Sequence, residues 1–174
     1  MTIEYVEQIP GSTTPARVFH STGKIQINRQ RWNQIPDEFH KKFILKHEEG
    51  HYEGRTNNEF FADEFAFNKL AGTEPLSLRK SITALTDVLP MTSPQHQQRV
   101  TAQTIRALRY DAVVNKNPKA FNALKQYYPW VVENISSFEE IAGKPEYKHN
   151  YKRIGNIALI LTILILIIVI IKKL

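Results

Sequence analysis

Two histidines four residues apart, His47 and His51, are the residues best suited to chemistry in this sequence of 174 residues. They enclose the segment His47-Glu48-Glu49-Gly50-His51, and on a helix residues four apart project from the same face, about one turn apart. Two imidazole nitrogens placed in this way can bind one zinc ion at about 2.0 to 2.1 Å, leaving positions for a third protein ligand and a water molecule. Glu48 lies beside His47 and can reach that water as a general base. The spacing therefore predicts a zinc site on a helix.

A second acidic segment follows after a short connection. Gly54 predicts the end of the first helix, and a new helix is expected to carry Glu59 and Asp63. So short a link requires the two helices to run antiparallel, which places Glu59 opposite His51 and Asp63 opposite His47. We therefore expect Glu59 to be the third zinc ligand and Asp63 to accept the second imidazole N–H of His47. Two alternatives stay open: Asp63 is the ligand in place of Glu59, or Glu59 only complements the helix dipole.

The two helices together resemble a known group of enzymes. HEEGH at 47–51 followed by EFFAD at 59–63 is similar to the gluzincin-type metallopeptidases, whose pattern is HExxH followed by a helix with ExxAD. The resemblance covers Asp37 to Gly72. Further along the chain, Thr92-Ser93-Pro94 is loosely similar to a Thr-His-Pro segment of membrane-bound HtpX-like peptidases, with Ser93 at the position of their histidine. The short spacing between the helices is nearer to compact HExxH domains of phage and mobile-element proteins.

This resemblance implies a zincin-like fold, one zinc ion per chain and hydrolysis of peptide bonds in a polypeptide substrate. Zinc would lower the pKa of its bound water toward about 7, so that Glu48 can accept the proton and later donate it to the leaving amine. The enzyme class that follows is a zinc metalloendopeptidase.

Turn and helix signals along the chain predict an α+β fold that is mainly α. Ile3–Val6 alternates weakly, and Arg17–His20 and Lys24–Asn28 flank Ser21-Thr22-Gly23, which predicts a β-hairpin with glycine at a positive φ. We expect this hairpin or small sheet to pack on the zinc helix pair, with Lys24–Asn28 as the exposed edge that pairs with an extended peptide. Helical segments are predicted over residues 37–53, 57–71, 76–89, 94–116 and 118–128.

The last part of the chain is a continuous apolar run. Between residues 154 and 171 only Gly155, Asn156 and Thr162 are not strongly apolar, and none of them is charged. Eighteen helical residues cover roughly 27 Å, which is close to the hydrocarbon thickness of a bilayer. We therefore predict one transmembrane helix that acts as a C-terminal tail anchor, with a buried core helix as the alternative. The expected organisation is a metallopeptidase domain at 1–143, a basic juxtamembrane segment at 144–153 and the anchor at 154–171.

The charge distribution agrees with a membrane partner. The net charge is +6, but residues 1–143 carry 17 Lys and Arg against 16 Asp and Glu, whereas the last 31 residues carry six basic residues and only Glu146. The basic excess can therefore meet anionic lipid headgroups, and nucleic acid is not expected as a partner. More basic residues precede the span than follow it, which predicts a cytoplasmic domain. The absence of cysteine leaves histidine and carboxylate as metal ligands, and the first ten residues do not resemble a secretory signal.

Two other functions fit the same residues. One is a structural or scaffolding membrane protein in which a closed, non-catalytic zinc site only braces the domain. The other is regulatory cleavage of one dedicated partner, which would leave generic substrates intact.

Overall fold

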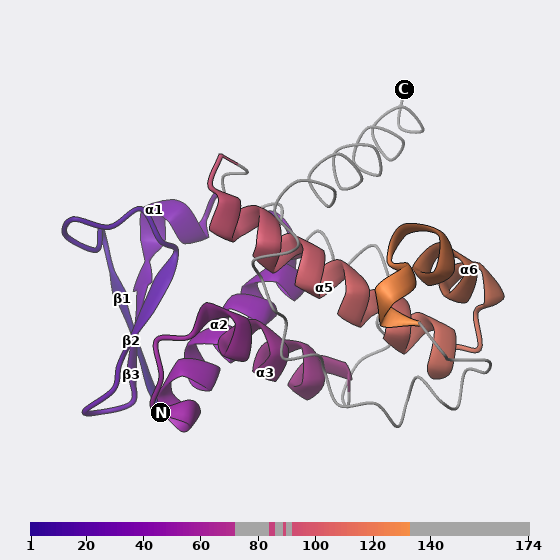
Figure 1. The fold of residues 1–174 in the computed structure, drawn as a ribbon. Coiled ribbons are helices and arrows are strands. Elements are labelled where there is room, and N and C mark those ends of the chain that lie inside the picture. The colour runs from indigo at the N-terminus through magenta and orange to yellow at the C-terminus, as the bar shows by residue number, and fades with distance from the viewer. Residues whose placement is uncertain (72–83, 86–88, 90–91, 133–174) are drawn as a thin grey trace. The chain divides into compact units, whose positions relative to one another are not determined.

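The computed structural model describes residues 1–71, 84, 85, 89 and 92–132 (Figure 1). The chain divides into two compact units, Met1–Leu89 and Pro90–Leu174. The described residues are mainly helical with one small three-stranded sheet, so the predicted α+β, mainly α class is confirmed. Almost all of the predicted helix at 76–89, the juxtamembrane segment 144–153 and the predicted anchor 154–171 lie outside these residues. In the part of the chain that is described, no helix is both long and apolar enough to cross a membrane.

The sheet contains the predicted hairpin. Strand β2 (Ala16–Phe19) pairs antiparallel with β3 (Lys24–Asn28), and β1 (Thr2–Val6) pairs parallel with β3. At the turn, Gly23 has a φ of 67° and its N–H donates to the Phe19 carbonyl at 2.8 Å. Glycine adopts this left-handed conformation without the steric conflict that a Cβ would cause. The expectation of a hairpin closed by Gly23 is therefore confirmed.

The expected position of β3 at the exposed edge is wrong. The strand order is β1-β3-β2, so β3 is the central strand and the edges of the sheet are β1 and β2. Parallel strands require a crossover connection rather than a tight turn, and here the segment between β1 and β2 supplies it. The turn signals of a hairpin carry no information about such a pairing, which is why the sequence suggested the wrong edge.

The buried face of the sheet packs on the helices that follow it. Ile25 and Ile27 alternate with more exposed residues along β3 and are 3% and 0% exposed, as expected for a strand with one face in the core. They belong to one apolar cluster whose buried members come from the sheet, from the short helix α1 (Arg29–Trp32), from the connection that follows it and from α2 (Glu38–Gly54). Asn28 ends β3 and caps α1, because its Oδ1 accepts a hydrogen bond from Arg31 N at 3.2 Å. Helix α1 was not predicted, since four residues are too few for a periodic pattern.

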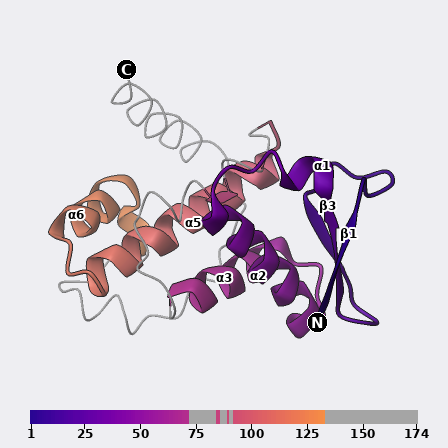
Figure 2. The same ribbon diagram turned by 180° about the vertical axis from the view of Figure 1, so that it is seen from behind.

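Helices α2 and α3 (Glu59–Ala71) form the predicted pair and lie side by side in both ribbon views (Figures 1 and 2). Asp37 caps α2 by accepting from Phe39 N at 2.7 Å, and Asn58 accepts from two N–H groups in the first turn of α3. The helix axes approach closely at Gly50. A Cβ there would lie 3.1 Å from Ala62 Cα and 3.0 Å from Phe65 Cβ.

Helix α2 ends at Gly54, close to the predicted boundary, but the left-handed residue is the next one. Arg55 has a φ of 46°, and its backbone N–H donates to carbonyls of the last turn. Position 54 excludes a side chain because of close packing, since a Cβ there would lie 2.3 Å from Cε1 of Phe61. The ring of Phe61 therefore occupies the space that the missing side chain leaves.

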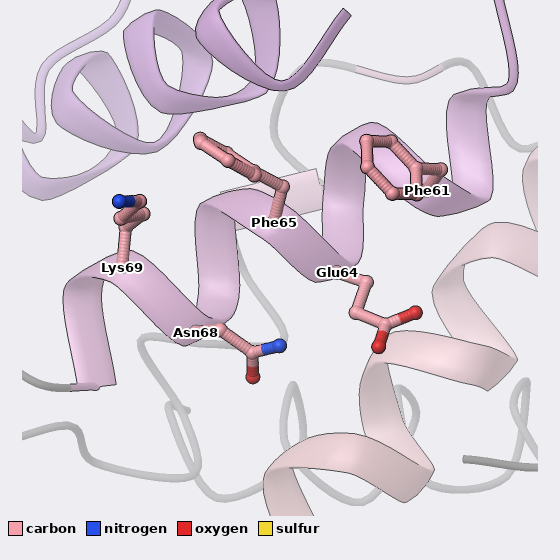
Figure 3. Close-up of a pocket in the computed structure, with 5 residues that line it drawn as sticks. All are labelled: Phe61, Glu64, Phe65, Asn68 and Lys69. Carbon is pink, nitrogen blue, oxygen red and sulfur yellow. The ribbon is translucent and has the colours of Figure 1, made fainter. Parts of the chain in front are cut away.

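One face of α3 carries mixed apolar and charged side chains. It lines a shallow hollow of about 230 Å³ (Figure 3). The Nζ of Lys69 lies 5.2 Å from the centroid of the Phe65 ring, within the range of a cation–π contact. Phe61, at the start of this face, is 40% exposed. The residues that line the hollow are Phe61, Glu64, Phe65, Asn68 and Lys69.

The described part of the second unit is helical. Helix α5 (Pro94–Val113) begins with proline in its first turn and packs on α6 (Pro118–Tyr127), which is followed by a 3₁₀ turn, Pro129–Val131 (η1). Asn117 caps α6 by accepting from Lys119 N at 3.0 Å. Both α5 and α6 were predicted, and α5 ends three residues earlier than expected.

Candidate metal centre

Three side chains from α2 and α3 converge on one point. His47 Nε2 lies 3.0 Å from His51 Nε2 and 3.3 Å from Glu59 Oε2, and His51 Nε2 lies 3.5 Å from Glu59 Oε1. All three ligand atoms lie within 4.8 Å of one another. This His-His-Glu group could hold a metal ion. The structure thus brings together the three residues that the sequence predicted as ligands.

The second nitrogen of each imidazole is held by an acceptor. His47 Nδ1 lies 2.8 Å from Asp63 Oδ1, and His51 Nδ1 lies 2.8 Å from the Thr56 carbonyl oxygen. A carbonyl or an ionised carboxylate can only accept, so Nδ1–H is the donor in both cases. When both imidazoles are neutral, each Nε2 would therefore present a lone pair to the point where the ligands meet, as in metal-bound histidine. The contact of Asp63 with His47 was predicted, whereas the Thr56 carbonyl was missed because a backbone group leaves no mark in the sequence.

The group of His47, His51 and Glu59 favours the binding of a positive charge. Burial lowers the pKa of His47 and is the largest single influence on it. Hydrogen bonds with Asp63 and Glu59, together with the charges of Asp63 and Glu48, outweigh burial and raise the pKa to about 9. Two imidazole lone pairs and a carboxylate oxygen in contact would otherwise repel one another. In the absence of a metal, a proton on His47 therefore relieves the repulsion at neutral pH, and a divalent cation would do so in its place.

The donor set fits zinc. Two imidazole nitrogens and one carboxylate oxygen are the ligands found in one class of catalytic zinc sites, which keep a further position open. Imidazole also suits other transition metals, so geometry and availability select among them. Both histidines are mostly buried, at 9% and 8% exposure, which shields a bound cation from bulk water.

Glu48 lies beside the ligand group without belonging to it. Burial is the main cause that raises the pKa of its carboxyl group. The neighbouring His47 and His51 lower that pKa, Glu59 raises it, and a hydrogen bond from the Val18 backbone lowers it. A carboxyl group whose pKa is shifted toward neutrality is suited to accept a proton and then return it.

The hydrogen bond from Val18 shows which part of the sheet faces Glu48. Asn28 N donates to the Pro15 carbonyl at 2.9 Å. In the antiparallel β2–β3 register, Pro15 and Arg17 therefore direct their backbone hydrogen-bonding groups toward β3. Alternate residues of an antiparallel strand turn their backbone groups away from the partner. The N–H of Val18 therefore points outward from the sheet, where it meets Glu48. The outer edge of β2 therefore borders the candidate metal centre, a contact that was not predicted from the sequence.

Comparisons with known proteins add no assignment. A scan against protein-family models matches no family, and searches of curated proteins and of solved structures find no match. The resemblance to gluzincins therefore stays a hypothesis that rests on the residues of α2 and α3.

Proposed function

We propose that this chain is a zinc metallopeptidase that hydrolyses peptide bonds, with Glu48 as the general base. The observation that carries the proposal is the convergence of His47, His51 and Glu59 beside a buried carboxyl group that is not one of the ligands. Three ligands converge among the described residues, and three protein ligands are typical of zinc sites that keep a position for water or substrate.

The chain supplies the remaining parts of a hydrolytic mechanism. Bound zinc would polarise a peptide carbonyl and lower the pKa of water at the open position. Glu48 would accept a proton from that water and deliver it to the amine that leaves. Asp63 and the Thr56 carbonyl keep both imidazoles in the orientation that binding requires. Burial raises the pKa of the Glu48 carboxyl group, which favours a carboxyl group that takes up a proton and then returns it.

The substrate would be an extended polypeptide that pairs with the outer edge of β2. Ala16 and Val18 direct their backbone groups away from β3. The Val18 N–H meets Glu48, and the edge of a sheet can add a further strand through main-chain hydrogen bonds to its remaining groups. A peptide in that position would run past Glu48. In this proposal β2 takes the role that the sequence had suggested for β3.

We further propose that the enzyme acts close to a membrane, held by residues 154–171 as a tail anchor. Support comes from the uncharged apolar run and from the basic residues on both sides of it. The greater number of basic residues before the run favours a cytoplasmic position for the domain.

Metal analysis combined with one substitution tests the proposed activity. We expect the purified full-length chain to contain about one zinc per chain by atomic absorption and to cleave an unfolded protein substrate. Glu48→Gln should keep the zinc and lose cleavage by a factor of about 100 or more, because general base catalysis contributes roughly 10²- to 10⁴-fold. Glu53→Gln, at an exposed position of the same helix, is the matched control.

The outcome separates the proposal from its alternatives. A metal-free protein, or equal activity of wild type and Glu48→Gln, would refute it. Bound zinc with four protein ligands and no exchangeable water, measured by X-ray absorption, would instead favour the scaffolding protein with a structural site. Cleavage confined to one partner would appear as a single Glu48-dependent difference between proteomes.

A further inference from the structure

We propose that a hollow beside the metal centre, between the end of β2 and the connection from α2 to α3, binds a carboxylate of the substrate peptide through Arg55. This inference rests on the proposed peptidase function and adds the chemical class that the site selects. We call the feature the Arg55 hollow. Its lining consists of His20, Ser21, Arg55 and Asn57.

The Arg55 hollow is an open depression that is large enough for a side chain. Its volume is about 410 Å³, and its walls come from two segments that a hydrogen bond joins, His20 Nε2 to Asn57 Oδ1 at 3.0 Å. The lining residues offer a guanidinium group, a hydroxyl and the amide N–H groups of Asn57, and they include no acidic side chain. Within the described ranges, the Arg55 side chain forms no hydrogen bond or ion pair. Its donors are therefore available to an anion, and guanidinium binds carboxylate with two parallel hydrogen bonds.

The backbone at Arg55 also favours a role for its side chain. Arg55 occupies the position after the last residue of α2 with a φ of 46°, where glycine is the commonest residue because it lacks a Cβ. Arginine is less stable than glycine in this conformation. An anion-binding role would account for a long cationic side chain at this position.

The position of the hollow relates it to the reacting bond. Arg55 and Asn57 flank Thr56, whose carbonyl accepts from His51 Nδ1. On the other wall, His20 follows Val18 by two residues, which is about 7 Å along an extended chain, and Val18 donates to Glu48. A peptide on the outer edge of β2 with its reacting carbonyl near Glu48 would thus place a group about two residues away in the Arg55 hollow.

Two sources of carboxylate fit this chemistry. An aspartate or glutamate side chain would make the enzyme an endopeptidase that prefers an acidic residue at one fixed position. A free C-terminus would make it a carboxypeptidase that removes a short C-terminal fragment. The same guanidinium would bind either group, and a set of matched peptides distinguishes them.

The experiment uses the full-length protein in detergent with bound zinc. A library of proteome-derived peptides is digested, and the cleavage sites are mapped by mass spectrometry. One cleaved sequence is then synthesised with Glu or Gln at the preferred position and with a free or amidated C-terminus. We expect the carboxylate form to be cleaved with a kcat/KM about 3 to 10 times higher than its neutral counterpart, mainly through KM, as for a partly exposed ion pair.

Substitutions then assign the preference to Arg55. Arg55→Gln should abolish the preference for carboxylate, Arg55→Glu should replace it by a preference for Lys, and Arg55→Lys should restore part of it. All three variants demand the same backbone conformation, so a folding defect would affect Arg55→Lys as much as the others. Arg31→Gln, an exposed arginine on α1, is the matched control and should keep the preference. Zinc content and thermal unfolding of each variant show whether the metal centre is intact.

Each outcome decides a different question. If no peptide is cleaved in a Glu48-dependent manner, the proposed function and the Arg55 hollow fail together. If Glu48-dependent cleavage occurs without a fixed carboxylate, or if Arg55→Gln keeps the preference, the hollow fails and the peptidase stands. A preference that disappears in Arg55→Gln and returns in Arg55→Lys supports the inference.

Discussion

The Nδ1 atom of His47 lies 2.8 Å from Oδ1 of Asp63, a carboxylate that is 1% exposed. The two residues come from different helices, so this hydrogen bond orients the imidazole and at the same time joins α2 to α3. It also commits one oxygen of Asp63 to His47. Glu59, which approaches both Nε2 atoms, is left as the carboxylate that faces the cation position.

Removal of the Asp63 carboxylate should weaken metal binding. In Asp63→Ala the His47 ring loses the acceptor that fixes its rotation and tautomer, and we expect zinc affinity to fall roughly 10- to 100-fold. Asp63→Asn keeps an oxygen acceptor and should lose less. Competition with a chromophoric chelator measures both affinities. Unchanged affinity in Asp63→Ala would refute the orienting role, whereas a loss in Asp63→Asn as large as that in Glu59→Gln would make Asp63 the third ligand.

The stability of the metal-free protein should fall as the pH rises. The pKa of His47 is raised from 6.5 to about 9 in the folded protein. Protonated His47 therefore stabilises the fold fully below about pH 6.5, and this contribution disappears as the pH passes through about 9. The difference corresponds to roughly 2 to 4 kcal/mol. The raised pKa of Glu48 acts in the same direction, since its proton is also lost on going to higher pH.

Thermal unfolding in the presence of a chelator at pH 6, 7.5 and 9 measures this effect. His47→Asn should flatten the dependence, because asparagine has no titrating group. Added zinc takes the place of the proton on His47. The stabilisation by zinc should therefore be largest at pH 9 and smallest at pH 6. Calorimetry in two buffers at pH 7 should show the release of about one proton per zinc bound. Release of no proton would contradict the protonated state of His47.

The proposed anchor should depend on its apolar character. Leu164 and Ile167 lie near the middle of the run at 154–171. An arginine at the centre of a transmembrane helix costs about 2.5 to 3.5 kcal/mol, so Leu164→Arg combined with Ile167→Arg should release the full-length chain from membranes. Alkaline extraction followed by sedimentation measures the membrane fraction, with Leu164→Ile and Ile167→Leu as the control. Retention of the doubly charged variant would contradict a spanning helix.

The sequence predicted those parts of the fold that depend on local signals. The helix pair followed from a four-residue spacing, from the stop signal at Gly54, and from a link so short that the two helices must run antiparallel. These local constraints were also sufficient to bring His47, His51 and Glu59 together, although their roles as zinc ligands stay a prediction.

Features that depend on distant backbone groups could not be predicted. The Thr56 carbonyl and the Val18 N–H belong to the site through main-chain atoms, which every residue type possesses. The parallel pairing of β1 with β3 left no turn signal, so the wrong strand was expected at the edge. Arg55 resembled an ordinary surface residue until its positive φ and the hollow around it were visible.

The close contact of α2 with α3 predicts a destabilising effect of a single methyl group at Gly50. Alanine would favour the helix by about 1 kcal/mol on propensity alone. Its Cβ would, however, lie 3.1 Å from the backbone of Ala62 and 3.0 Å from Phe65 Cβ, neither of which is the end of a flexible side chain. The helices must then separate by a few tenths of an ångström, and overpacking of this kind costs about 1 to 3 kcal/mol.

We therefore expect Gly50→Ala to be destabilised by about 1 kcal/mol overall, despite its higher helix propensity. Because Glu59 and Asp63 lie on the helix that is displaced, zinc affinity should fall together with stability. Glu53→Ala, at an exposed position of the same helix, is the control for an alanine that does not touch α3 and should change neither quantity by more than about 0.5 kcal/mol. Denaturant unfolding with and without zinc measures both. A Gly50→Ala protein that is more stable and binds zinc as well as wild type would show that the two helices can separate without loss, and that their close contact does not set the geometry of the metal centre.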